Sequence, residues 1–269
     1  MLQAVGTPRS LAEAHAMLAA GQGVRIIAGG TAVMPALNYG TDDFTTLVSL
    51  RHAGLSGISI AGGRAEIGAA VTLSELEDEA ALAFLRPALL AIASPTIRNM
   101  ATVGGNLLVK QPYGDFAACL VALGASVSVS DGASSRPVPI DDLLKAGVKA
   151  NEIVTAVSFA IPPDGAFRFV KAGRKALNAA AIVTVAALVM TKGGAVSQSR
   201  IALGGVAPRV VRASSVETAL AGKPLDRPNV EKAAARASAD IDPFDDAYAS
   251  AWYRARVTPV HIRRALLGE

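Results

Sequence analysis

The sequence predicts an α+β protein with two domains in close contact. Short runs of β-branched residues broken by glycine pairs predict strands, and apolar residues at helical spacing predict helices between them and near the C-terminus. Strands and helices do not alternate regularly, so a doubly wound parallel sheet is not expected. A strand over residues 153–162 ends at a double proline, and we place the boundary just after it, between domains of residues 1–165 and 166–269.

The first domain is expected to begin with a helix, because Ser10 and Glu13 form a capping box ahead of apolar residues at helical spacing. Residues 24–28 follow as a short strand that ends at a glycine pair. Another pair, Gly62-Gly63, predicts a two-residue hairpin turn. The remaining strands are expected at residues 47–50, 58–61, 65–68 and 125–130. Helices are expected at 72–76 and at 81–94 with a break at Pro87. Residues 31–37 are expected to form a turn that leads into a short helix, and residues 112–123 a loop followed by a helix.

The second domain is expected to begin with a three-stranded meander and to end in helices. Gly193-Gly194 predicts the hairpin turn between its second and third strands. Thr258 as a cap and Pro259 at the first helical position predict a separate, short last helix. The strands are expected at residues 167–172, 181–191 and 196–203, and the earlier helices at 212–221, 230–239 and 247–257.

Composition restricts the possible function. Apolar residues make up 51% of the chain and aromatic residues only 4%, so the core must be built from small aliphatic side chains. A single cysteine, Cys119, which we interpret as a buried core residue, and three separated histidines cannot supply an iron–sulfur cluster or an ordinary zinc site. No apolar stretch approaches the ~20 residues of a membrane-spanning helix, and no signal peptide is visible, so we expect a soluble, cytoplasmic protein.

Positive charge is spread along the chain. The net charge is +4 without a long basic run, so nucleic acid is not an expected partner. The densest basic segment contains Arg254, Arg256, Arg263 and Arg264 with His261. A solvated helix face and a contact with an acidic partner subunit both remain open for this segment.

Two glycine-containing segments are the strongest candidates for a binding site. Residues 25–31 and 101–106 each place two glycines after a short β-branched run, where positive φ and missing Cβ atoms let backbone N–H groups approach a bulky anion. Thr31 and Asn106 add side-chain donors. A glycine pair is also the commonest hairpin turn, so the pairs alone leave phosphate binding and a plain turn equally open. Neither segment has the spacing of a Rossmann fingerprint or a P-loop.

Residues 28–31 and 101–106 resemble the two diphosphate motifs of the flavin domain in molybdenum hydroxylases of the xanthine dehydrogenase and carbon monoxide dehydrogenase type. The likeness continues at residues 97–99, 201–208 and 250–254, so it covers essentially the whole chain in order. It implies that the first domain is a FAD-binding domain of the p-cresol methylhydroxylase (PCMH) and vanillyl-alcohol oxidase fold, with two subdomains. The second would be a C-terminal α+β domain with a three-stranded sheet and helices.

The resemblance implies that both motifs surround the diphosphate of FAD, which is held non-covalently because neither motif contains histidine or cysteine. On this basis Gly104→Val is expected to abolish FAD retention, because the new side chain would occupy the approach of the diphosphate. The implied residues are Arg25, Ile26, Ile27, Ala28, Gly29, Gly30, Thr31, Ala32, Val33, Thr102, Gly104, Gly105 and Asn106.

Four further residues are implied as FAD contacts. Asp115 would accept hydrogen bonds from FAD hydroxyls, and a cap on the helix beginning at the next residue is an additional role for it. Ile153 and Val154 match a position whose aliphatic side chain approaches the flavin ring, with plain strand core as the alternative. Lys171 matches a lysine beside the flavin, with a surface lysine as the alternative.

The resemblance also implies a division of labour between subunits. A large partner would hold molybdopterin, a small partner would hold [2Fe–2S] clusters, and this chain would pass electrons through FAD to an acceptor such as NAD⁺ or oxygen. No residue here would need to act as an acid, base or nucleophile, and no convincing catalytic triad is visible. A free-standing FAD-dependent oxidoreductase and a non-catalytic nucleotide-binding or assembly subunit are the alternatives.

Overall fold

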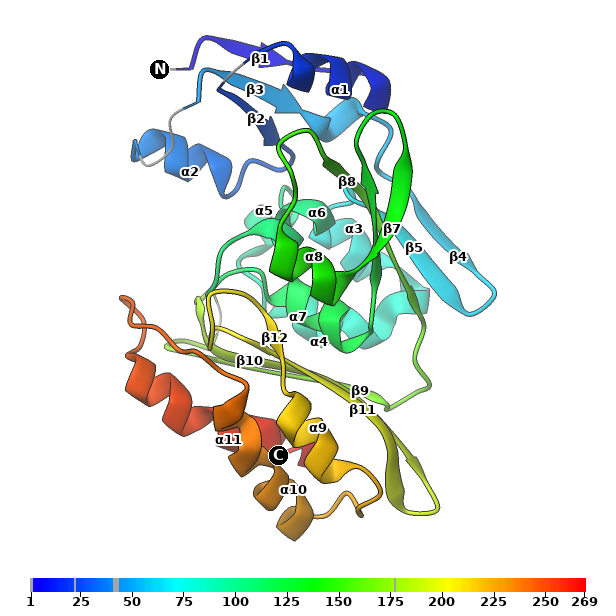
Figure 1. Cartoon of the computed structure of the whole chain (residues 1–269), viewed down its shortest axis with the longest axis vertical. Coiled ribbons are helices and arrows are strands. Elements are labelled where there is room, and N and C mark those ends of the chain that lie inside the picture. Colours follow the sequence, from blue (N-terminus) through cyan, green and yellow to red (C-terminus); the bar gives the residue numbers. More distant parts are fainter. Residues whose placement is uncertain (1, 22, 41–43, 177) are drawn as a thin grey trace.

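The computed structural model describes residues 2–21, 23–40, 44–176 and 178–269, and it confirms a mixed helix and sheet architecture with three sheets. The sheets follow one another along the long axis of the molecule, with helices between and beside them (Figure 1). The first two sheets are built from residues up to Ala160 and the third from Phe167 onward. The domain boundary at residues 165 and 166 stays a prediction within that interval.

The first sheet contains three parallel strands in the order β1-β3-β2. Helix α1 begins after Ser10, whose Oγ accepts a hydrogen bond from the Glu13 N–H at 3.2 Å, which is the first half of the predicted capping box. The Glu13 carboxylate accepts from the Arg9 N–H at 2.8 Å and not from the Ser10 N–H, so the second half of the box is absent. Strand β1 was not predicted, because three residues are too few to show an alternation. The bounds are β1 Ala4–Gly6, α1 Leu11–Ala19, β2 Val24–Ile27, α2 Val33–Asn38 and β3 Thr46–Ser49.

The second sheet is antiparallel throughout, in the order β4-β5-β8-β6-β7. Gly62 and Gly63 have φ of 55° and 72° and form the predicted hairpin turn. Helix α7 is buried along its whole length and shares a core with this sheet. The strands are β4 Ile58–Ala61, β5 Arg64–Gly68, β6 Ser126–Ser130, β7 Ser135–Pro139 and β8 Ile153–Ala160.

Short helices cover the second sheet and connect its strands. The helix expected over residues 81–94 is divided at Pro87, which lies in the first turn of α4. Helices α6 and α8 were not predicted. The bounds are η1 Leu50–His52, α3 Leu73–Asp78, η2 Ala80–Leu85, α4 Arg86–Leu90, α5 Pro95–Arg98, α6 Val103–Leu108, α7 Asp115–Ala122 and α8 Ile140–Ala146.

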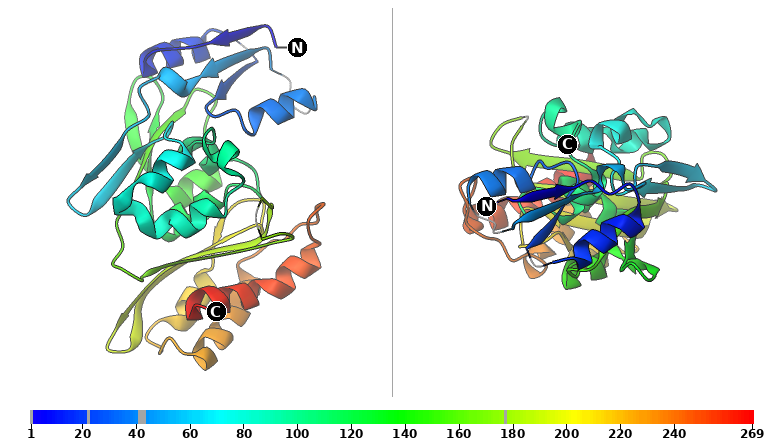
Figure 2. Two further views of the ribbon diagram at one scale, coloured as in Figure 1. Left: turned by 180° about the vertical axis from the view of Figure 1, so that it is seen from behind. Right: turned by 90° about the horizontal axis from the view of Figure 1, so that it is seen from above.

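The third sheet separates α7 from the C-terminal helices (Figures 1 and 2). The cross-strand partners Ala186 and Ala202 belong to the core that contains α7, whereas Val185 and Leu203 belong to the core beneath the C-terminal helices. Alanine on the α7 side lets that helix approach closely. The predicted meander is present as β9 Phe167–Gly173, β10 Ala181–Lys192 and β11 Ala195–Gly204. A fourth strand, β12 Val211–Arg212, extends the predicted three-stranded sheet. The helices that follow are α9 Ser214–Leu220, α10 Arg227–Ala234, η3 Ala235–Ala239 and α11 Ala251–Leu267.

Helix α11 runs through Pro259, so the prediction of a separate last helix beginning at Thr258 is wrong. Thr258 lies inside the helix, and its hydroxyl donates to the Arg254 carbonyl at 2.6 Å. Beyond the proline, Ile262 and Leu266 are fully buried in the core under the third sheet. Burial of one continuous apolar face therefore outweighs the backbone hydrogen bond that proline removes.

Arg254 connects α11 to the third sheet. It is completely buried, and its Nη1 donates to the carbonyls of Ala181, Ile182 and Gly205 at 3.0, 2.8 and 2.7 Å. Its Nη2 forms an ion pair with Asp246 at 2.6 Å. One guanidinium thus binds three backbone carbonyls and the Asp246 carboxylate together.

We expect Arg254→Met to lower the free energy of unfolding by about 3–5 kcal/mol, because the Asp246 carboxylate would lose its cation and three carbonyls their donor. Arg256→Met is the matched control on the same helix, where an exposed side chain should cost less than about 0.5 kcal/mol. Urea unfolding followed by circular dichroism measures both. Equal midpoints for the two variants would contradict the role given to Arg254.

Candidate functional site

The two glycine segments lie against each other in the structure, although they are far apart in the sequence. A Cβ atom built on Gly29 would lie 1.7 Å from the Met100 carbonyl oxygen and 3.1 Å from the Ala101 Cα. Only glycine permits this approach of two backbones, because any side chain would overlap the second segment. The turn at Gly29 therefore contacts the residues that immediately precede α6.

The first segment offers a run of free backbone donors. It leads from β2 into α2, and Gly30 adopts a positive φ of 73° at the turn. The N–H groups of residues 29–33 donate to no acceptor in the part of the chain that the structure describes, and the segment is partly exposed. Several such donors within one turn form a concave site that suits an anion such as a diphosphate.

The second segment differs from the prediction, since its glycines lie inside helix α6 and have no positive φ. Thr102 is the N-cap, and its Oγ1 accepts a hydrogen bond from the Gly105 N–H at 3.1 Å. The N–H groups of Val103 and Gly104 donate to carbonyls of residues 69–71, both at 2.9 Å. The expectation of a second set of free amides is wrong, because these donors already have acceptors within the chain.

The two glycines of α6 have different surroundings. A Cβ atom on Gly104 would lie 2.9 Å from the Ala69 Cβ and 3.1 Å from its carbonyl oxygen, so this glycine allows α6 to pack closely on the segment after β5. Gly105 is exposed, and a Cβ atom there would approach only the Thr102 hydroxyl, at 3.1 Å. A valine side chain at position 104 was expected to occupy the approach of the FAD diphosphate. This expectation is wrong, because the side chain would first disturb the packing of α6 on Ala69.

Asn106 connects α6 to α7. Its Oδ1 accepts a hydrogen bond from the Phe116 N–H at 3.0 Å, and its side chain is largely buried. Helix α7 begins at Asp115 after Gly114, which has a φ of 82°. The Asp115 side chain makes no capping hydrogen bond, so the capping role considered for it is wrong, and Asn106 performs part of that role.

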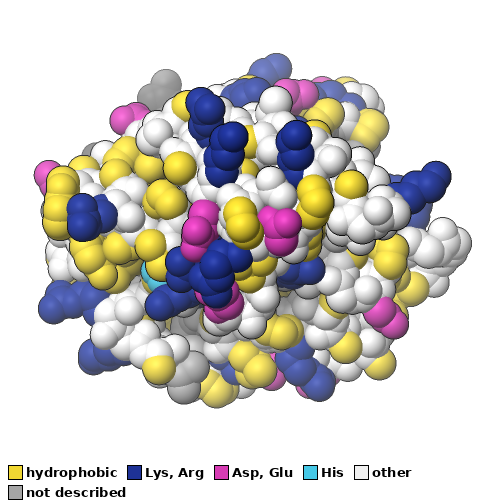
Figure 3. Space-filling model, turned by 90° about the horizontal axis from the view of Figure 1, so that it is seen from below, with side chains coloured by type: hydrophobic (Ala, Val, Ile, Leu, Met, Phe, Trp, Pro, Cys, Tyr) yellow, Lys and Arg dark blue, Asp and Glu magenta, His cyan; other side chains and the backbone are white. Residues whose placement is uncertain are grey.

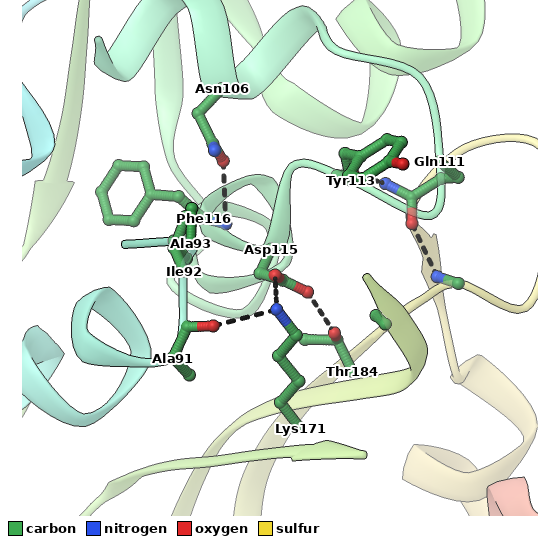
Figure 4. Close-up of polar contacts among 12 residues, drawn as sticks. Ala91, Ile92, Ala93, Asn106, Gln111, Tyr113, Asp115, Phe116, Lys171 and Thr184 are labelled. Carbon is green, nitrogen blue, oxygen red and sulfur yellow. Dashed lines mark hydrogen bonds and ion pairs between the residues drawn. The ribbon is translucent and has the colours of Figure 1, made fainter. Parts of the chain in front are cut away.

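Asp115 lies at the centre of a buried polar cluster that joins the first domain to the third sheet (Figure 4). Its Oδ2 pairs with the Lys171 Nζ at 2.7 Å, and its Oδ1 accepts from the Thr184 hydroxyl. Lys171 also donates to the Ala91 carbonyl at 2.9 Å. The side chains of Lys171 and Asp115 are only 9% and 5% exposed, so the alternative of a surface lysine is wrong.

Ile153 and Val154 lie in the core of the first domain. Ile153 packs in the small cluster that contains Val48 of β3, and Val154 belongs to the larger cluster under the second sheet. These positions match the plain strand-core alternative, and a contact of either residue with a flavin stays a prediction.

Cys119 is also completely buried, as expected. Its burial and, to a smaller extent, the nearby negative charge of Asp115 raise the pKa of its thiol.

Two residues near the Asp115 cluster were missed. Thr184 is a hydroxyl residue in the otherwise apolar stretch of residues 181–190, and that isolation was a signal that could have found it. Gln111 accepts a hydrogen bond from the Gly205 N–H at 2.6 Å and donates to the Tyr113 carbonyl at 2.8 Å. No local pattern distinguishes Gln111, because its partner is distant in the sequence.

We expect Gly29→Ala to lower the free energy of unfolding by about 3 kcal/mol or more, because its methyl group would overlap the Met100 carbonyl. Gly57→Ala is the matched control, since a Cβ atom there would have no neighbour within 4 Å. Thermal and urea unfolding of both variants without cofactor measure the difference. A Gly29→Ala protein as stable as the control would show that the two segments are not in contact.

The Asp115–Lys171 pair should show strong coupling. Asp115→Asn and Lys171→Met alone should each cost about 3–5 kcal/mol, because one buried charge would remain without its partner. The double variant should be more stable than the sum of the two effects by about 1–3 kcal/mol. The exposed pair Arg227–Glu231 is the control, with an expected coupling of about 0.3–0.5 kcal/mol. Additive effects at Asp115 and Lys171 would exclude a direct interaction.

The sequence matches the family described as the FAD binding domain in molybdopterin dehydrogenase over residues 3–163, and the CO dehydrogenase flavoprotein C-terminal domain over residues 167–268. It is 33% identical to the carbon monoxide dehydrogenase medium chain of Afipia carboxidovorans, covering 96% of this chain and 93% of that one. It is 28% identical to the xanthine dehydrogenase FAD-binding subunit of Escherichia coli O157:H7, covering 96% and 92%.

Solved structures show the same similarity. The reconstituted CO dehydrogenase from Oligotropha carboxidovorans superposes with a TM-score of 0.93 at 31% identity, over 99% of this chain and 96% of that one. The enzyme from Hydrogenophaga pseudoflava gives 0.93 at 28% identity, over 99% and 96%. Both domains and their order are shared, so this chain belongs to the FAD-binding flavoprotein subunits of the molybdopterin dehydrogenase family.

Proposed function

We propose that the free N–H groups of residues 29–33 bind the FAD diphosphate, and this run of donors is the observation that carries the assignment. Arg25, Ile26 and Ile27 on β2 and Ala28 at its end would position the turn. The donors lie between a strand end and a helix start, so they are fixed before the cofactor arrives. An anion there would gain partners without the ordering of a flexible loop.

In this proposal α6 supplies shape and a side-chain donor. Exposed Gly105 lets the cofactor approach the α6 backbone, and Thr102 keeps the first turn of the helix in place. Asn106 uses its carbonyl oxygen to hold α7, which leaves its amide nitrogen as a possible donor. Gly104 would act indirectly, by letting α6 pack against Ala69.

We retain Asp115, Ile153, Val154 and Lys171 as proposed contacts of the FAD. Each Asp115 oxygen already accepts one hydrogen bond, but a carboxylate can accept about four, so a cofactor hydroxyl still has an acceptor. Pairing with Asp115 also fixes Lys171, and a positive charge at a fixed place beside a flavin would influence its reduction potential.

The chain is then the electron-transfer subunit of a molybdenum hydroxylase complex. FAD takes up electrons one at a time and can release two together as hydride. In our proposal the electrons come from [2Fe–2S] clusters of a small subunit, after a large molybdopterin subunit has oxidised the substrate. We propose NAD⁺ as an acceptor to be tested first.

No helix in the described part of the chain is long and apolar enough to cross a membrane. We propose a cytoplasmic location.

Thr31→Glu should weaken FAD binding roughly 100-fold while preserving the fold, because a carboxylate beside the diphosphate would repel it by about 3 kcal/mol. Thr191→Glu, on the exposed end of β10, is the matched control. The FAD content of each purified protein is measured after release by heating, and the affinity by titrating FAD into protein stripped of cofactor.

The same measurements separate the alternatives. FAD in the wild-type protein with binding unchanged in Thr31→Glu would move the diphosphate away from residues 29–33. A wild-type chain that binds FMN or no flavin would favour the non-catalytic subunit. A chain that binds FAD and oxidises a small substrate without partner subunits would favour the free-standing oxidoreductase.

A further inference from the structure

The basic segment near the C-terminus divides into buried and exposed members. Arg254 is completely buried and pairs with Asp246. Arg263 pairs with Glu231 and Glu269, each at 3.3 Å. These two arginines are thus used within the chain. Arg256 and Arg264 are exposed, and within the described residues neither forms an ion pair with a carboxylate.

Arg256 and Arg264 lie on one outward face of α11, which we call the α11 face. Its members are exposed and follow helical spacing. Trp252, the sole tryptophan of the sequence, is 68% exposed, and Tyr253 and Val260 are 44% and 38% exposed. The α11 face consists of Trp252, Tyr253, Arg256, Val260 and Arg264.

The α11 face combines apolar area with positive charge. The Arg256 guanidinium lies 5.5 Å from the centre of the Trp252 ring, so the cation and the aromatic side chain form one surface. Helix α11 contains no aspartate or glutamate from Ala251 to Leu267. Seen from below, hydrophobic, basic and some acidic side chains share the surface of the C-terminal domain (Figure 3).

A pair of tyrosines joins the segment before α11 to the first domain. Tyr248 precedes α11 and its hydroxyl lies 2.6 Å from that of Tyr113, with the rings edge to face at 6.3 Å. Tyr113 follows α6 in the sequence and precedes Asp115, and both tyrosines are partly exposed. The segment that leads into α11 therefore contacts the first domain just after α6.

We propose that the α11 face, extended by Tyr248 and Tyr113, docks another subunit of the same complex through an acidic and partly apolar surface. This inference rests on the proposed function. Tryptophan, tyrosine and arginine are the residues that contribute most to protein–protein binding when they are gathered in one patch. Two arginines without carboxylate partners in the described residues would find those partners on the docked subunit.

A second copy of this chain is a poorer occupant. A two-fold contact would place the α11 face against itself, because the same surface is used on both sides of such an interface. Arg256 and Arg264 would then face the arginines of the other copy, with no acidic residue on either α11. Like charges at an interface oppose association, so charge complementarity selects a different, acidic chain.

The test uses the chain loaded with FAD and the large and small subunits of the complex. Binding of the chain to the two subunits is measured by biolayer interferometry, and assembly by size-exclusion chromatography with light scattering. Trp252→Ser should weaken binding about 30-fold, as for the loss of an interface anchor. Arg256→Glu should weaken it about tenfold or more, and Arg256→Lys should retain most of the affinity because the charge is kept.

Matched controls lie outside the α11 face. Arg236→Glu on η3 reverses an exposed charge in the same domain, and Ile60→Ser on β4 removes an exposed apolar side chain. Both should bind within about twofold of the wild type. FAD content and the unfolding midpoint of every variant are measured in the same samples, so loss of cofactor or of folding is recognised separately from loss of docking.

Several results would overturn the proposal. These are unchanged affinity in both Trp252→Ser and Arg256→Glu, a wild-type chain that fails to bind the two subunits, or a homodimer that Trp252→Ser dissolves. If the wild-type chain binds the subunits through this surface but carries no FAD, the docking inference stands and the proposed function fails. If the wild-type chain carries FAD but binds the subunits through another surface, the proposed function stands and the docking inference fails.

Discussion

The contact between two backbones at Gly29 is the constraint on which the candidate site depends. The turn after β2 can meet the Met100 carbonyl only because no side chain lies between them. This contact holds the turn that carries the N–H groups of residues 29–33 against the residues that lead into α6. Without it, the turn after β2 and the start of α6 would not be held together.

A second, polar contact orders the next layer of the molecule. Asp115, at the start of α7, pairs with Lys171 of β9 and accepts from Thr184 of β10. A buried charge pair of this kind contributes little net stability against a well-packed apolar alternative, but it is strongly unfavourable when misaligned. It therefore fixes how α7 lies on the third sheet. The alanine pair Ala186 and Ala202 makes room for the same helix.

The sequence allowed strands, hairpin turns and capped helices to be predicted where the signal was local. Gly62-Gly63 and the Ser10 cap are examples, since turn and cap geometry depend on a few neighbouring residues. Prediction failed where distant contacts decide. Pro259 lies within α11 because the core beyond it is buried, and Gly104 is needed because of Ala69, 35 positions earlier in the chain. Similarly, the glycine pairs at residues 29–30 and 104–105 look alike in the sequence. Among the described residues, only the first pair lies in a run of backbone N–H groups without acceptors.

The same distinction explains the division of the C-terminal arginines. A row of arginines in a sequence indicates only that a helix is basic, because the sequence does not show which guanidinium groups find carboxylates. The fold assigns Arg254 and Arg263 to partners inside the chain, and it leaves Arg256 over Trp252 and Arg264 exposed further along the helix. An exposed cation over an exposed indole keeps part of its surface away from water without neutralising its charge. Such a surface has more to gain from an acidic partner than either side chain would have alone.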